Sequence, residues 1–303
     1  MTDADTAPTP QTSHPREPEG IDVRLSTIRW TLSLTSLLVA GPIAAGLVAG
    51  VRGPDGGPEA SLFTGESLGP GLIALVVSFA LAAVLGVVSA RFAGPRSGLR
   101  NAGFVIAWAS FATGEVDRII IIADSAGPFR AIAVEGVVVG LLGLVLCGLI
   151  LLASRPTAHV ELRDFGDGDT KPWQGSLSLA GLVAFAASAI IAVVVGGYLA
   201  FDESMRGQAI LAACVGGLLA GLVGRLAGSA IDASGPPPAL ACMAGLLAAG
   251  VIAPWLPGFM TGDSNAIVEA ARSGTLPSAA HVLPLDWLAG TLIGVQIGMV
   301  WAG

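Results

Sequence analysis

The chain has 303 residues, of which 53% are hydrophobic, 12% are charged and 42 are glycine. A soluble domain carries about 25% charged residues, so this composition excludes an ordinary soluble enzyme, a coiled coil and a disordered chain. It predicts an all-α integral membrane protein whose first partner is the lipid bilayer. The formal net charge of −7 gives no basis for a nucleic-acid partner.

The N-terminal segment 1–25 is rich in proline, threonine and acidic residues and buries too little apolar surface to order itself. We expect a disordered cytoplasmic tail. The first apolar run starts near Trp30, and its length suits a membrane span rather than a signal peptide.

Apolar segments follow along the rest of the chain, each of about the 20 residues that a helix needs to cross a bilayer. The seventh is the shortest, and Pro254 and Pro257 interrupt its far end, which predicts a kinked or re-entrant helix, or one that continues to Met260. The eight predicted spans are Trp30–Val51, Pro70–Ala90, Ala102–Ile122, Ala131–Ala153, Ser176–Ala200, Gln208–Arg225, Pro238–Pro254 and Leu285–Ala302.

Basic residues give the orientation, because they accumulate near membrane ends on the cytoplasmic side. With the N-terminus inside, ten of the 15 basic residues fall in cytoplasmic segments, and the cluster at 91–100 is the densest. Both termini are therefore predicted to be cytoplasmic. All basic residues but Lys171 are arginine. This preference is typical of a GC-rich coding sequence, which favours a bacterial protein of the plasma (inner) membrane.

Two stretches of the first half resemble stretches of the second. Residues 31–37 read TLSLTSL and residues 176–182 read SLSLAGL, while residues 85–94 (LGVVSARFAG) match residues 219–228 (LAGLVGRLAG). An even number of spans in each half predicts parallel repeats. The alternative is chance similarity between alanine-, glycine- and leucine-rich helices.

Acidic residues also open the last span of each half, Glu135 in the fourth and Asp286 in the eighth. We interpret the chain as a 4+4 internal duplication. Its predicted parts are the tail 1–25, a first four-helix half 26–153, a cytoplasmic linker 154–175 and a second four-helix half 176–303.

The candidate substrate- or ion-binding residues are Glu115, Asp117, Arg118 and Glu135. On the predicted boundaries the first three lie inside the third span, and charges at such depth are costly and usually functional. Two other interpretations remain: the helix ends near Gly114 and the charges are interfacial, or Glu115 and Arg118 form a structural pair three residues apart.

A short turn at 125–129 predicts that the third and fourth spans are antiparallel neighbours, with Glu115 and Glu135 at comparable depths. Three acids against one arginine leave excess negative charge. In a low-dielectric setting a proton or a bound cation would relieve that excess.

Glycines recur at four-residue spacing, which lets helix backbones approach closely. The series Gly290, Gly294 and Gly298 is a candidate contact with another copy or a complex partner, although packing within the chain is the favoured interpretation. The three cysteines and three histidines show no metal-ligand or haem spacing, so no cofactor and no metal are expected.

Function is the least determined property. The duplicated halves, the interrupted seventh span and the membrane acids favour a transporter or permease for a small solute or ion. The alternative is a non-catalytic scaffold or complex subunit, since few polar residues line the spans. An intramembrane enzyme ranks third, because no catalytic constellation is present. A water-accessible cavity reaching Glu115 or Glu135 would favour transport, and a solid glycine-packed interior would favour the scaffold.

The topology is tested by single-cysteine labelling in a cysteine-free background. A cysteine that replaces Asp167 should react with a membrane-impermeant reagent only after the membrane is permeabilised. The reason is that the linker carries basic residues, which accumulate on the cytoplasmic side. Labelling of this position from the periplasm alone would refute the orientation.

Overall fold

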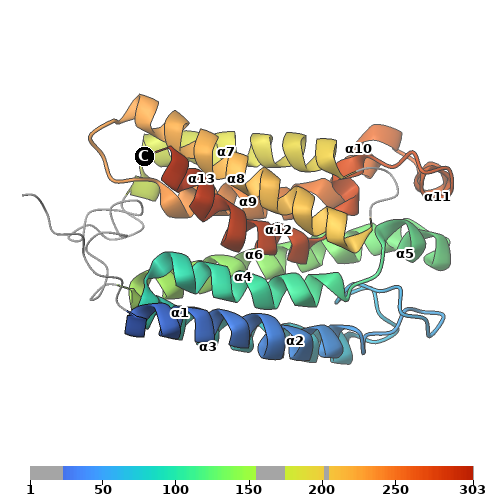
Figure 1. The fold of residues 1–303 in the computed structure, drawn as a ribbon. Coiled ribbons are helices and arrows are strands. Elements are labelled where there is room, and N and C mark those ends of the chain that lie inside the picture. The colour runs from blue at the N-terminus through green and yellow to red at the C-terminus, as the bar shows by residue number, and fades with distance from the viewer. Residues whose placement is uncertain (1–22, 155–174, 201–204, 303) are drawn as a thin grey trace, which may run out of the picture.

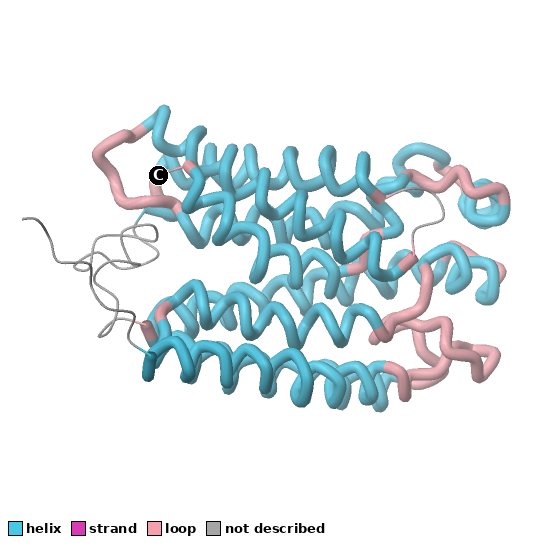
Figure 2. Tube along the Cα trace, viewed as in Figure 1, coloured by secondary structure: helices cyan, strands magenta, loops and turns pink. Residues whose placement is uncertain are grey.

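The structure, a computed structural model, describes residues 23–154, 175–200 and 205–302, and within them it contains helices and no strand (Figure 2). The predicted tail 1–25 lies mostly outside the described residues, as does nearly all of the linker 154–175. Among the described residues, six helices are long and apolar enough to cross a membrane: Val23–Val48, Leu68–Ala93, Gly127–Ala153, Leu179–Leu199, Arg206–Ile231 and Ala239–Met260.

The first half contains one continuous helix with a π-helical turn, then a close pair of helices, a short helix and a long one. These elements are α1 (Val23–Thr35), η1 (Ser36–Ala40), α2 (Gly41–Val48), α3 (Leu68–Ala93), α4 (Pro95–Phe111), α5 (Val116–Ala123) and α6 (Gly127–Ala153).

The second half begins with two long helices and ends with a helix that contains a second π-helical turn. Its elements are η3 (Gly175–Leu177), α7 (Leu179–Leu199), α8 (Arg206–Ile231), α9 (Ala239–Ile252), η4 (Ala253–Trp255), α10 (Leu256–Thr261), α11 (Ser264–Arg272), η5 (Ser278–His281), α12 (Pro284–Gly290), η6 (Thr291–Val295) and α13 (Gln296–Trp301). The seventh predicted span thus continues past Pro254 through a 3₁₀ turn into α10.

The long helices run side by side and give the molecule two ends (Figure 1). At the linker end, α1 begins, α6 ends and α7 begins. At the cap end lie the short helices α5, α10 and α11.

The third predicted span is wrong at both ends. Its helix, α4, begins at Pro95 and ends at Phe111 rather than running to Ile122. Gly114 explains the ending: its N–H donates to the carbonyl of Ala60 at 2.8 Å, and a Cβ at this position would lie 2.6 Å from the Ala60 nitrogen. This contact with the first loop draws the chain out of the helix, so Glu115 precedes the separate helix α5.

On α7, small residues face inward and large apolar residues face outward, as in membrane helices that pack by close backbone approach. On α7 the buried side includes Ala184, Ser188 and Gly196, whereas Leu182 and Ile190 are more than 60% exposed. A soluble core would bury the large side chains instead. This inverted pattern indicates that lipid surrounds the helices.

The two halves meet along two pairs of helices. The helix α6 packs on α9, where a Cβ on Gly136 would lie 2.5 Å from the carbonyl oxygen of Gly250. The last helix, through α12 and η6, packs on α4, where a Cβ on Gly103 would lie 2.5 Å from Ile293. Glycine therefore sets the spacing at both contacts.

The glycine series of the last helix packs within the chain. A Cβ would lie 2.3 Å from the carbonyl oxygen of Ala213 if added to Gly290, and 2.2 Å from that of Cys214 if added to Gly294. At Gly298 the corresponding distance, to the Leu218 carbonyl, is 1.8 Å. The three glycines thus form the contact of the last helix with α8, and a partner contact through them stays a prediction.

A second, smaller hydrophobic cluster lies at the cap end. It joins α5 and the start of α6 to α11 and the segment before α12, through buried side chains such as Ile120, Ile132, Ile267 and Leu283. The cap is thus packed on its own core, separate from the main bundle core.

Gly294→Ala should lower stability by about 1–3 kcal/mol, because a new methyl group would overpack the contact with α8. Unfolding by denaturing detergent measures the change. The control is Gly148→Ala on α6, where an added Cβ meets nothing within 4 Å and helix propensity should leave stability unchanged or raised. Equal behaviour of the two variants would contradict the close contact.

Candidate functional site

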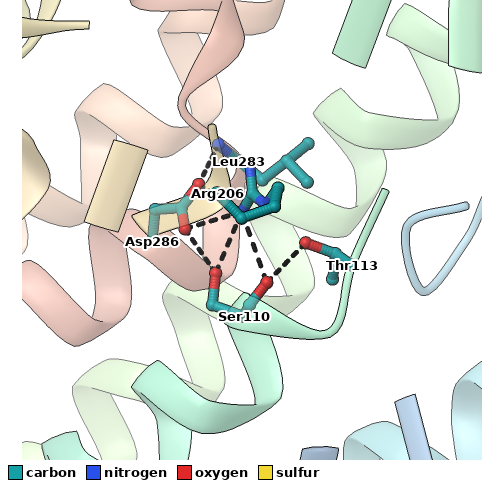
Figure 3. A network of polar contacts seen from close by, with 5 residues as sticks. All are labelled: Ser110, Thr113, Arg206, Leu283 and Asp286. Carbon is teal, nitrogen blue, oxygen red and sulfur yellow. Dashed lines mark hydrogen bonds and ion pairs between the residues drawn. The ribbon is translucent and has the colours of Figure 1, made fainter. Parts of the chain in front are cut away.

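A buried ion pair joins the start of α8 to the start of α12 (Figure 3). Nη2 of Arg206 donates to both carboxylate oxygens of Asp286, at 2.7 Å each. The side chains are 9% and 0% exposed. A pair this deeply buried costs desolvation free energy, which good geometry and additional hydrogen bonds must offset.

The first half supplies part of that compensation. The hydroxyl of Ser110, near the end of α4, donates to Oδ1 of Asp286 and accepts from Nη2 of Arg206 at 3.1 Å. Thr113 donates to the Ser110 carbonyl at 2.7 Å and fixes the end of the helix. The network therefore spans the interface between the halves.

Local chemistry at the two helix starts explains the geometry. Pro284 opens α12, and the Leu283 N–H before it donates to Oδ2 of Asp286 at 2.7 Å, so the acid caps the positive end of its own helix. Arg206 is the first residue of α8, where a cation opposes the helix dipole. The carboxylate of Asp286 offsets this repulsion.

Glu135 on α6 is a second fully buried acid. Its Oε2 accepts from the N–H of Phe63 at 3.1 Å, while its Oε1 has no hydrogen-bond partner. Glu135 is thus held by the first loop, whereas Asp286 is held by Arg206 and Ser110.

The other predicted residues lie nearer the surface at the cap end. Nε of Arg118 pairs with Glu115 at 3.0 Å, and its Nη1 pairs with Glu59 of the first loop at 3.3 Å. The Arg118 side chain is 63% exposed. These charges are a partly exposed pair on α5, outside the long helices.

Asp117 has a different partner. Its Oδ1 lies 3.3 Å from Nδ1 of His281, a buried residue of η5 in the second half. The structure therefore brings Glu115 and Arg118 together, and places Asp117 and Glu135 in other contacts.

Sequence reasoning missed Arg206 and Ser110. Arg206 stands at the edge of an apolar run and looks like an ordinary loop arginine, while Ser110 is one of many small residues in a span. The available signal was Asp286, an acid at the start of a buried helix that requires a partner. The first-loop residues Glu59 and Phe63, which contact Glu115 and Glu135 respectively, are also far from them in the sequence.

The main cavities do not reach these acids. Five of the best-formed cavities among the described residues have volumes of about 140 to 670 Å³, and none of the five is lined by Glu115, Glu135, Arg206 or Asp286. Within the described part of the chain, no group of three or more histidine, cysteine or acidic residues could hold a metal ion.

Comparison with known protein families, with curated proteins and with solved structures finds no match to this chain.

Arg206→Gln and Asp286→Asn should each lower the unfolding free energy by about 3–5 kcal/mol, because each leaves a buried charge uncompensated. The double variant should cost much less than the sum of the two. Unfolding in detergent measures all three, with Arg118→Gln as an exposed control expected to cost under about 1 kcal/mol. Additive single effects would show that the pair does not act as a unit.

Proposed function

We propose that this protein is a permease-like membrane transporter coupled to a proton or small cation. Its two halves, 26–153 and 176–303, would move against each other around the buried acids Glu135 and Asp286. The observation that carries the proposal is a buried ion pair, Arg206 with Asp286, that Ser110 links to the first half, together with a second fully buried acid, Glu135. Ionisable groups inside a membrane bundle mark ion pathways by default.

The two acids have similar roles in the two halves. Glu135 holds the backbone of Phe63, in the segment that leads into α3. Asp286 holds Arg206, at the start of α8. Each acid on the last helix of its half thus anchors the entrance to the second helix, which supports the proposed 4+4 duplication.

The interface supports the same proposal. In a duplicated chain α4 of the first half corresponds to α9 of the second, and α6 corresponds to the last helix. The contact of α6 with α9 is then equivalent to the contact of the last helix with α4. A parallel repeat has this property. The proposal includes α4 and the last helix as spans, eight in all, with both termini and the linker end in the cytoplasm.

Two buried acids, one paired with an arginine and one not in the same ion pair, provide a coupling device. In the described arrangement Arg206 neutralises Asp286, and Glu135 keeps an oxygen without a hydrogen bond. Nε of Arg206 is also buried without a partner. Unsatisfied buried atoms typically mark a water or ion position, so a proton or cation at Glu135 would complete the site.

Opening between α4 and the last helix would break the contacts of Ser110 and admit water to the acids. In this proposal the predicted residues Glu115, Asp117 and Arg118 form the outer rim, because Glu115 and Arg118 bind Glu59 in the same loop that holds Glu135. None of the five cavities reaches Glu115 or Glu135, which by the criterion given above favours the scaffold; in the transport proposal this arrangement corresponds to a closed state.

The second candidate is a non-catalytic scaffold or complex subunit. The glycine contacts between α8 and the last helix favour it, because backbones in such close contact form a rigid body. Under this function the buried ion pair of Arg206 and Asp286 would only hold the two halves in a fixed arrangement.

Flux separates the two functions. Purified protein in liposomes, under an imposed pH or sodium gradient, should dissipate that gradient, and Glu135→Gln should abolish the effect, because an amide does not exchange a proton at these pH values and has no negative charge to bind a cation. The matched control is Glu269→Gln, an exposed residue on α11, which should behave as wild type. Flux that survives Glu135→Gln would refute the proposed site.

Infrared difference spectra between two pH values provide a readout that needs no substrate. If Glu135 binds a proton, a carboxylic acid band should disappear in Glu135→Gln and persist in Glu269→Gln. Absence of flux together with unchanged spectra would support the scaffold.

A further inference from the structure

Two adjoining cavities run along the outside of α4, and nothing described above uses them. The first has a volume of about 490 Å³ and lies between α1, η1 and α4. The second has a volume of about 300 Å³ and lies between η1, α4 and the start of α8. Leu37 and Phe104 line both, so the two form one groove.

The groove has a basic, polar end. Its lining near the linker end includes Arg29, Arg100, Ser26 and Ser33, and none of the described residues that line it is acidic. Nη2 of Arg100 donates to the hydroxyl of Ser33 at 3.1 Å, which holds the guanidinium over the groove. Trp30 beside them is 67% exposed, as expected of a residue at the level of lipid headgroups.

The rest of the groove is apolar. From Leu37 and Phe104 it continues past Ala107, Trp108 and Phe111 to Ile210. Along α4, Arg100 and Phe111 are eleven residues apart, or about 16 Å at 1.5 Å per residue. One leaflet of a bilayer has a hydrocarbon layer of about 15 Å.

We propose that this groove binds an anionic phospholipid of the leaflet at the linker end. Arg29 and Arg100 hold its phosphate headgroup, and one acyl chain lies along α4 against Trp108 and Ile210. Charge decides the headgroup class, because the charged side chains among the described lining residues are two arginines, and this favours a net negative lipid. The matched length of groove and leaflet decides the occupant, because a free phosphate would leave the apolar part unfilled.

The lipid would bridge the two halves, since α4 belongs to the first and Ile210 to the second. This inference is independent of the transport proposal, because it rests on the outer surface of α4 and not on the buried acids.

Native mass spectrometry of the full chain, released from mild detergent and titrated with lipid, tests the site. Phosphatidylglycerol should bind more tightly than phosphatidylcholine with the same acyl chains. Arg29→Gln and Arg100→Gln should each weaken phosphatidylglycerol about fivefold, while Arg91→Gln, an exposed arginine of the same end outside the groove, should not.

A second variant tests the acyl groove without changing charge. Ala107→Leu should fill the apolar part and reduce the binding of phosphatidylglycerol. Excess inorganic phosphate should leave the lipid bound. Equal affinity of the wild type for both lipids, unchanged binding after Arg29→Gln and Arg100→Gln, or displacement by phosphate would each overturn the proposal.

Discussion

The close backbone contact between α8 and the last helix determines the positions of the buried side chains around it. Gly290 lies one turn after Asp286, and a side chain there would meet the backbone of α8. Helices that pack through larger side chains lie about 8–10 Å apart. Glycine removes that spacer, so the carboxylate of Asp286 reaches Arg206 directly rather than through water.

The ion pair is in turn held by the first half. Ser110 contacts both charges, and its helix approaches the last helix because Gly103 leaves room for Ile293. Backbone spacing, buried charge and the contact between halves therefore depend on one another. A substitution that alters one of the three should therefore alter the other two. The surface pair of Glu115 and Arg118 has no such dependence on the packing of the halves.

Composition and periodicity predict most of this fold, because membrane helices are specified by local apolar length. The continuation of the seventh span past Pro254 and the turn before α6 were predictable in this way. The end of α4 was not, because a contact between Gly114 and Ala60 decides it, and that contact joins segments distant in sequence. Arg206 escaped prediction for a similar reason: its partner lies 80 residues away, and no local pattern separates a pairing arginine from a loop arginine.

The short helix α4 has a consequence for biogenesis. It carries Arg96, Arg100 and Asn101 within its 17 residues, and polar side chains of this kind disfavour entry of an isolated helix into lipid. Its neighbour α3 supplies the missing partner, since Asn101 donates to Ser89 at 2.8 Å and only Gly94 separates the two helices. In the proposed eight-span topology, the insertion machinery would therefore handle α3 and α4 as one hairpin, and the apolar helix α3 would bring the more polar helix α4 into the bilayer.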